Sequence, residues 1–331
     1  MLRSLSHNRL GAEGAAALAP ALAANGSLTS LNLSSNNLCS VTETGYIKAS
    51  QVQGSSFNEG DKVVYQGKEM IVSKAKDRDG DIKMTNLPDM SGLNALADAS
   101  RVNGGLTSVD VRRNNIAGDG AVQLAAAVLR NLKIEMFNEI PIKEMRADSF
   151  TELDLKEKHV GVEGGLVVAD LIPVMGGLTA LDLSSNSLKD EGVSAVCKAI
   201  QTNKETKLAL LNFKNNGIGP SGANAVAAMV AVIGALTRVD VRHNNITGDG
   251  AAQLSAAVLG NLKIEMFNEI PIKEMRANSL TELDLNGKWV GVEGGMVVAG
   301  LIPVMGGALT QVLVFRSPWI SLFCSLTIAL L

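Results

Sequence analysis

Apolar and polar positions recur along most of this chain in one fixed order. In the stretch that begins at Leu178, numbered here as position 0, apolar residues fall at positions 0, 3, 5 and 10, and Asn186 falls at position 8. The same five positions are matched by the stretches that begin at Leu28, Leu106, Leu208 and Leu236. Five matches to one pattern indicate an internal repeat.

The repeated pattern predicts a strand, a turn and a helix in each unit. The alternation of Leu181, Asp182 and Leu183 indicates a short strand with its leucines directed inward. Asn186 falls where the chain turns away, and its amide can donate to and accept from backbone groups that have lost their ladder partners. Successive units are 28 to 30 residues apart, which leaves room for a helix after each turn.

With this pattern the chain resembles leucine-rich-repeat proteins of the ribonuclease-inhibitor type. The resemblance covers about four-fifths of the sequence. It implies an α/β fold, a leucine-rich-repeat solenoid shaped as a horseshoe, with parallel β-strands on the concave face and helices on the convex face. Such a fold does not by itself specify a function.

The repeats are interrupted once, and a block of them is duplicated. Residues 1–39 contain the first repeats, of which the first is truncated, and repeats continue over residues 88–316. Residues 40–87 lack the pattern, but they hold β-rich runs and hairpin signals that predict an inserted β-meander, weakly similar to SH3-like barrels. Residues 106–177 and 236–307 match at 59 of 72 positions, which indicates an internal duplication.

Each duplicated block contains one irregular unit. It begins at Leu132 in the first block and at Leu262 in the second, and it is too short for a full helix. The following unit has a lysine, Lys158 or Lys288, at the asparagine position. We therefore do not expect an even curvature of the solenoid at these two places.

Composition argues against several classes of function. The 331 residues include 30 basic and 33 acidic ones, and aromatic residues make up 3%. This balance does not favour binding to nucleic acid. The three cysteines form no CxxC pair, so neither a zinc site nor a disulfide framework is indicated. No secretory signal follows Met1, and we expect a reduced protein in the cytoplasm.

Local motifs suggest other chemistry only weakly. The run Gly217-Ile-Gly-Pro-Ser-Gly222 matches the GxGxxG pattern of dinucleotide-binding proteins, but glycine recurs in these repeats wherever a strand leads into a helix. Asp77–Asp81 resembles the start of a calcium loop with its glycine misplaced, and a hairpin tip is the better interpretation. No nucleophile motif accompanies a histidine. We expect no cofactor, metal or small-molecule substrate, and a nucleotide binder or enzyme stays an alternative.

The last residues form an apolar tail, residues 317–331. The uncharged stretch from Trp319 to Leu331 has 13 residues. As a helix it would reach only about 20 Å, whereas the hydrocarbon core of a bilayer is about 30 Å thick. We expect the tail to cover the last repeat or to reflect a gene-model artefact. Attachment to a membrane through this tail is the alternative.

The remaining candidate site is the predicted concave face. Side chains at positions 4, 6 and 7 point away from the core, and parallel strands would align them in rows about 4.8 Å apart. The row at position 4 is mostly acidic, and arginine is common at binding hot spots. We expect a non-enzymatic module that binds another protein through this face, with Arg112, Arg113 and Arg242 as anchors; the alternative is a merely solvated sheet. The predicted contact residues are Asn32, Ser34, Asp110, Arg112, Arg113, Asp154, Lys156, Asp182, Ser184, Asn212, Lys214, Asp240, Arg242, His243 and Asp284.

Overall fold

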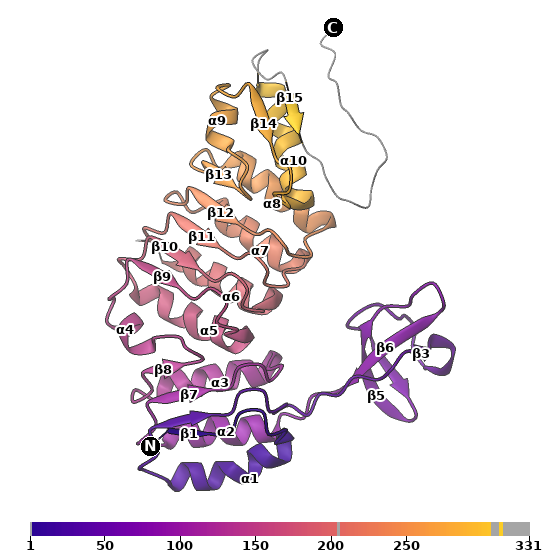
Figure 1. Cartoon of the computed structure of the whole chain (residues 1–331), viewed down its shortest axis with the longest axis vertical. Helices are drawn as coiled ribbons and strands as arrows, with labels where there is room; N and C mark the ends of the chain where they lie inside the picture. The colour runs from indigo at the N-terminus through magenta and orange to yellow at the C-terminus, as the bar shows by residue number, and fades with distance from the viewer. Residues whose placement is uncertain (1, 204–205, 306–310, 314–331) are drawn as a thin grey trace. The chain divides into compact units, whose positions relative to one another are not determined.

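The computed structural model describes residues 2–203, 206–305 and 311–313 (Figure 1). The chain divides into two compact units. The first comprises Met1–Ala147 with Lys158–Leu171, and the second comprises Asp148–Glu157 with Ile172–Leu331. Each unit is built from repeats of a strand followed by a helix, in which parallel strands alternate with helices as the sequence predicts.

The first unit contains a parallel four-stranded sheet with the order β1-β2-β7-β8. Its strands are β1 (Leu2–Ser4), β2 (Ser30–Asn32), β7 (Ser108–Asp110) and β8 (Met136–Phe137). Its helices are α1 (Gly11–Ala24), α2 (Ser91–Val102), α3 (Gly118–Arg130), α4 (Ile142–Arg146) and α5 (Gly161–Leu171).

The second unit contains a parallel five-stranded sheet, with the order β13-β12-β11-β10-β9, and a separate parallel pair, β14 and β15. The strands are β9 (Glu152–Asp154), β10 (Ala180–Asp182), β11 (Leu210–Asn212), β12 (Arg238–Asp240), β13 (Met266–Phe267), β14 (Glu282–Asp284) and β15 (Gln311–Leu313). The helices are α6 (Lys189–Thr202), α7 (Pro220–Val230), α8 (Gly248–Gly260), α9 (Ile272–Arg276) and α10 (Gly291–Leu301), with short 3-10 turns at Ile172–Val174 and Ile302–Val304.

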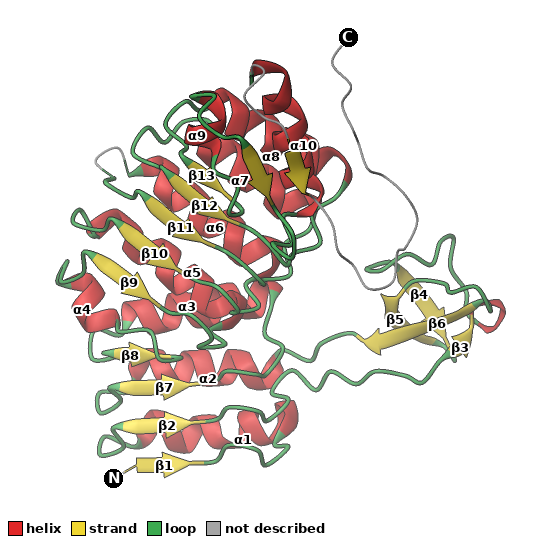
Figure 2. Ribbon diagram, turned by 45° about the horizontal axis from the view of Figure 1, so that its top comes forward, coloured by secondary structure: helices red, strands yellow, loops and turns green. Residues whose placement is uncertain are grey.

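In this unit the yellow strands lie side by side, with the red helices along one face of the sheet (Figure 2). The core lies between the two layers. Leu181 and Leu183, at positions 3 and 5, are buried as the alternation predicts, and so are Val193 and Val196 of α6. Residue 182, between the two leucines, lies on the opposite face of its strand. The curvature of the predicted horseshoe stays a prediction.

The asparagine at position 8 joins neighbouring repeats, which confirms its predicted role. The Asn216 Nδ2 donates to the carbonyl oxygens of Leu183, at 2.8 Å, and Phe213, at 3.0 Å. Its Oδ1 accepts from the backbone N–H groups of Asn186 and Leu188, each at 3.2 Å. Because these groups have no ladder partner where the chain turns, one buried amide satisfies groups on two repeats.

The irregular units solve the same problem in another way. In the first block Asn138 replaces the missing position-8 asparagine, and its Oδ1 accepts from Val111 N at 2.9 Å. Its Nδ2 donates to Glu163 Oε1 at 3.0 Å. Glu163 is buried, and this burial raises the pKa of its carboxyl to about 8. Asn268 and Glu293 repeat the arrangement in the second block. The five-residue helices α4 and α9 agree with the prediction that these units are too short for a full helix.

Residues 47–86 form a four-stranded antiparallel sheet with the order β3-β6-β5-β4. Its strands are β3 (Ile47–Lys48), β4 (Lys62–Tyr65), β5 (Lys68–Lys74) and β6 (Asp81–Asn86), and a 3-10 turn occupies Ala49–Gln51. A small core packs Val63, Val72 and Ile82 together. Asp89 N donates to Cys39 O at 2.9 Å, so the chain leaves and rejoins the repeats at adjacent points. The similarity to SH3-like barrels stays a prediction.

Candidate functional site on the open face of the second sheet

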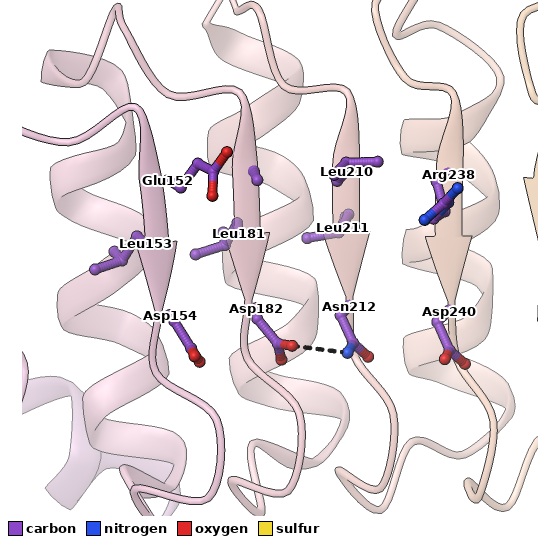
Figure 3. A pocket seen from close by; sticks show the side chains of 11 residues that line it. Glu152, Leu153, Asp154, Leu181, Asp182, Leu210, Leu211, Asn212, Arg238 and Asp240 are labelled. Carbon is purple, nitrogen blue, oxygen red and sulfur yellow. Dashed lines mark hydrogen bonds between the residues drawn. The ribbon is translucent and has the colours of Figure 1, made fainter.

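The face of the β9–β12 sheet opposite its helices, called the open face here, contains a hollow of ≈ 350 Å³. Leu153, Leu181 and Leu211 lie along its floor (Figure 3). Two rows of side chains cross the strands above them. One row comes from position 4 of the repeat, and the other comes from position 2.

The position-4 row is explained first by local structure. Each of its side chains accepts a hydrogen bond from the backbone N–H two residues later, as Asp182 Oδ1 does from Ser184 N at 2.8 Å. The same turn is made by Asn32, Asp110, Asp154, Asn212, Asp240 and Asp284. Aspartate and asparagine are favoured at such turns because their short side chains mimic a backbone acceptor. The strand ends therefore account for an aspartate or asparagine at this position, whatever else its side chain contacts.

The structure brings only part of the predicted row onto one sheet. Asp154, Asp182, Asn212 and Asp240 lie on adjacent strands, and Asp182 Oδ2 accepts from Asn212 Nδ2 at 2.9 Å (Figure 3). Asn32 and Asp110 belong to the sheet of the first unit, and Asp284 belongs to the β14–β15 pair.

The predicted anchor Arg242 is held inside the chain. It is 9% exposed, and its Nη2 lies 2.7 Å from Asp240 Oδ2. Its Nη1 pairs with Glu269 and donates to the carbonyl of Lys288 at 3.2 Å. Lys288 Nζ lies 2.8 Å from Glu269, and this contact, together with Arg242, lowers the pKa of the Glu269 carboxyl below its usual value. These charges tie together three successive loops.

The first block contains the equivalent network. Arg112 pairs with Asp110 at 2.8 Å and with Glu139 at 2.6 Å, and it donates to the carbonyl of Lys158 at 3.0 Å. Lys158 Nζ lies 2.9 Å from Glu139. The lysine at the asparagine position is thus matched by an arginine and a glutamate from neighbouring units. Two of the three predicted anchors, Arg112 and Arg242, thus hold loops in place, and their guanidinium groups already have carboxylate partners.

Other predicted residues are more accessible. Arg113, Lys156 and His243 are exposed, whereas Ser34 and Lys214 are half-buried. Ser184 is 2% exposed, and its Oγ has no hydrogen-bond partner among the described residues.

The centroids of the His243 and Trp289 rings lie 5.5 Å apart. Trp289 is 71% exposed, and its position in the repeat did not mark it as a candidate. Burial and the neighbouring Lys214 and Arg242 lower the pKa of His243.

The position-2 row was also missed. Glu152, Ala180, Leu210 and Arg238 are aligned across β9 to β12 by the strand register. Leu210 is 39% exposed, although it is a large apolar residue. The alternation rule could have found this row, because positions 2 and 4 of a strand face the same side.

The GxGxxG run has a structural role. Gly219 N, directly before α7, donates to Asp190 Oδ1 at 2.6 Å. A Cβ atom at Gly222 would lie 2.5 Å from the same oxygen. A carboxylate therefore occupies the helix end where the dinucleotide pattern would place a phosphate. The structure does not favour nucleotide binding at this run.

Residues 2–203, 206–305 and 311–313 contain no group of three His, Cys, Asp or Glu side chains placed to hold a metal ion. Within the same ranges, none of the helices has the length and apolar character needed to cross a bilayer. Cys39 and Cys197 are buried free thiols. The tail from Trp319 to Leu331 and Cys324 lie outside the described residues, and the cytoplasmic location stays a prediction.

Comparison with known proteins agrees with the repeats. Family models described as "Leucine Rich repeat" match residues 4–19, 106–125, 178–197 and 236–255, and one described as "Leucine Rich Repeat" matches residues 27–47.

Similar proteins include Protein CARMIL of Dictyostelium discoideum, 27% identical over 44% of this chain and 13% of that protein. RAN GTPase-activating protein 2 of Arabidopsis thaliana is 28% identical over 42% of this chain and 23% of that protein. The protein phosphatase 1 regulatory subunit 37 homolog of Caenorhabditis briggsae is 29% identical over 36% of this chain and 13% of that protein. The chain thus matches less than a quarter of the length of each of these relatives. The ribonuclease-inhibitor type is compatible with these matches, and the chain is a leucine-rich-repeat protein.

Proposed function

We propose that this chain is a non-enzymatic interaction module, and that the open face of the β9–β12 sheet binds a partner protein. The observation that carries the proposal is Leu210, a leucine 39% exposed within a hollow whose rim is charged. An apolar centre inside a polar rim is the usual composition of a protein–protein interface. In the predicted horseshoe this face is the concave one.

The relatives support the same class of function. One is named as a regulatory subunit of a phosphatase and another as an activator of a GTPase, so both names describe proteins that act on other proteins. The hollow is lined by 11 residues, whereas a stable interface involves about 20–30 residues on each partner. We therefore propose that neighbouring exposed residues of the same face, among them Lys156 and His243, extend the contact.

Arg112 and Arg242 act here as supports of the loops, whereas the sequence suggested that they contact the partner directly. Arg112 and Arg242 fix the loops at the strand ends through their carboxylate partners. A fixed loop presents its exposed neighbour in one conformation, which lowers the entropy lost on binding. In the unit that contains the hollow, the partner then contacts His243 rather than the guanidinium group of Arg242.

A single substitution at the centre of the hollow tests the proposal. Leu210→Glu places a charge in the apolar centre. The control Val232→Glu places one at an apolar residue that is 65% exposed and lies two residues after the end of α7. Purified wild type and both variants, checked for equal melting temperature, are used to capture proteins from a cell extract. Captured proteins are identified, and their binding is repeated with purified components.

The expected result is a protein that binds wild type and Val232→Glu, and whose affinity for Leu210→Glu is reduced at least about tenfold. If Leu210→Glu binds every captured protein as tightly as Val232→Glu does, the open face is not the binding surface.

A further inference from the structure

Along the position-2 row of the hollow, the side chains change from acidic through apolar to basic. Across four adjacent strands it contains an acidic residue, Glu152, then Ala180 and Leu210, then a basic residue, Arg238. Glu152 and Arg238 are both exposed, and among the described residues neither forms an ion pair. The position-2 row therefore has one acidic end, an apolar centre and one basic end, and Asp182 of the position-4 row adds a carboxylate on the strand next to the acidic end.

The neighbouring position-4 row strengthens this asymmetry. At the β9 end Asp154 is exposed and adds a second negative charge beside Glu152. At the β12 end Asp240 is paired with Arg242, so its charge is compensated within the chain. The β9 end is thus net acidic, and Arg238 makes the β12 end net basic.

The spacing of the strands sets the size of a complementary segment. Three strand separations of about 4.8 Å place the two ends roughly 14 Å apart. An extended peptide advances about 3.3 Å per residue, so residues i and i+4 span about 13 Å. In an extended chain residues i, i+2 and i+4 also project from the same side. One side of a five-residue segment therefore fits the whole hollow.

We propose that the hollow binds an extended segment of a partner protein that lies across the strands and carries a basic residue, an apolar residue and an acidic residue at i, i+2 and i+4. The inference rests on the proposed function, because it names the segment that the open face takes. The basic residue pairs with Glu152 and Asp154, and the acidic residue pairs with Arg238. The apolar side chain packs on Leu210 in the space that the small side chain of Ala180 leaves open.

Three capped peptides test the order of charge. They have the cores Lys-Ser-Leu-Ser-Glu, Lys-Ser-Leu-Ser-Lys and Glu-Ser-Leu-Ser-Glu, and each is titrated at low salt into the full chain while amide NMR shifts of residues around Leu210 are followed. Because a peptide can lie in either direction, the mixed-charge peptide represents both orders. We expect wild type to bind it about tenfold more tightly than either like-charged peptide, since each of these replaces one attraction by a repulsion.

Charge reversal at either end then changes the preferred peptide. Glu152→Lys is combined with Asp154→Asn, which keeps the turn acceptor for Lys156 N but removes the second carboxylate, and this variant is expected to prefer the peptide with two glutamates. Arg238→Glu is expected to prefer the peptide with two lysines. A variant that is merely destabilised cannot gain affinity for a new peptide. Ala180→Leu fills the hollow and is expected to weaken all three peptides, whereas Val232→Glu, outside the hollow, leaves the order unchanged.

The inference is wrong if the three peptides bind wild type equally, if none binds at millimolar concentration, or if the reversals leave the preference unchanged. The proposed function is judged separately, by capture with Leu210→Glu. If Leu210→Glu fails to capture the partner but wild type binds the three peptides equally, the open face is still the binding surface and only the proposed segment is wrong. Unchanged capture by Leu210→Glu would reject the surface itself.

Discussion

The guanidinium of Arg242 lies against the carboxylate of Asp240, two residues earlier, with Nη2 2.7 Å and Nε 3.0 Å from its oxygens. The same carboxylate accepts from the backbone N–H of Arg242 at 3.0 Å, so one aspartate closes the turn and also holds the side chain that follows it. An arginine at this position is therefore part of the loop structure as well as of the surface.

Removal of either arginine is predicted to destabilise the protein. Arg242→Ala leaves Asp240 and Glu269 without their shared partner, and breaking a buried pair costs about 3–5 kcal/mol. Because this pair is only partly buried, we expect a loss of roughly 2–3 kcal/mol in the free energy of unfolding. Arg112→Ala is expected to behave similarly, and urea titration measures both.

Lys156→Ala is the matched control, since Lys156 occupies the same position of the repeat but is exposed. Its substitution is expected to change stability by less than about 0.5 kcal/mol. Equal stability of Arg242→Ala and Lys156→Ala would show that the network contributes nothing. Charge reversal of Arg112 and Arg242 is also a poor test of binding. It would disrupt the loops that these arginines hold, so weaker binding could come from lost structure alone.

The asparagine at position 8 is predicted to be among the most sensitive polar residues. Asn216→Ala removes the donor and the acceptor that serve Leu183, Phe213, Asn186 and Leu188. Each buried group left without a partner costs about 1–3 kcal/mol, so a loss of roughly 3 kcal/mol or more is expected. Asn245→Ala, at an exposed asparagine of the next repeat, serves as the control in the same unfolding experiment. If Asn216→Ala lowers the free energy of unfolding no more than Asn245→Ala does, the position-8 asparagine does not stabilise the repeats.

The spacing of residues in the repeats predicted much of the fold but less of the candidate site. The inward leucines and the position-8 asparagines could be predicted, because burial and unpaired backbone groups leave a period in the sequence. The networks of Arg112 and Arg242 could not, since they join residues up to 46 positions apart through chain geometry that no local pattern encodes. Leu210 was missed because its position varies among Glu152, Ala180 and Arg238 in the neighbouring repeats.

The buried Glu163 is predicted to make stability depend on pH. Burial raises the pKa of its carboxyl to about 8, whereas an unfolded glutamate ionises near about 4.3. Between these values the folded state binds one more proton than the unfolded state, so stability falls as pH rises, by at most about 1.4 kcal/mol per unit. The loss is complete above the folded pKa. Glu163→Gln cannot ionise and should flatten the slope of unfolding free energy between pH 5 and 8.

Glu293 has a pKa raised in the same direction by its burial, so the double variant with Glu293→Gln should flatten the profile further. Urea titrations at four pH values compare the three proteins. An unchanged slope in the double variant would mean that both carboxyls are already ionised in the folded protein.

The sheet of residues 47–86 is predicted to be dispensable for partner binding through the open face. Asn86 Nδ2 donates to Ser40 O at 2.9 Å, so the two ends of this segment lie close together and can be joined directly. Deletion of residues 41–87 should leave the affinity for the captured partner within about twofold of wild type, because the hollow belongs to the other unit. A partner bound only by the intact chain would assign recognition to the deleted segment.

Photo-crosslinking from position 210 tests the central claim most directly. A benzophenone amino acid replaces Leu210 at the centre of the hollow in one protein and Val232, after α7, in another. After irradiation with the purified partner, we predict a covalent adduct from position 210, with its attachment point in a segment that carries a basic, an apolar and an acidic residue at alternate positions. An adduct from position 232 and none from position 210 would contradict binding through the open face.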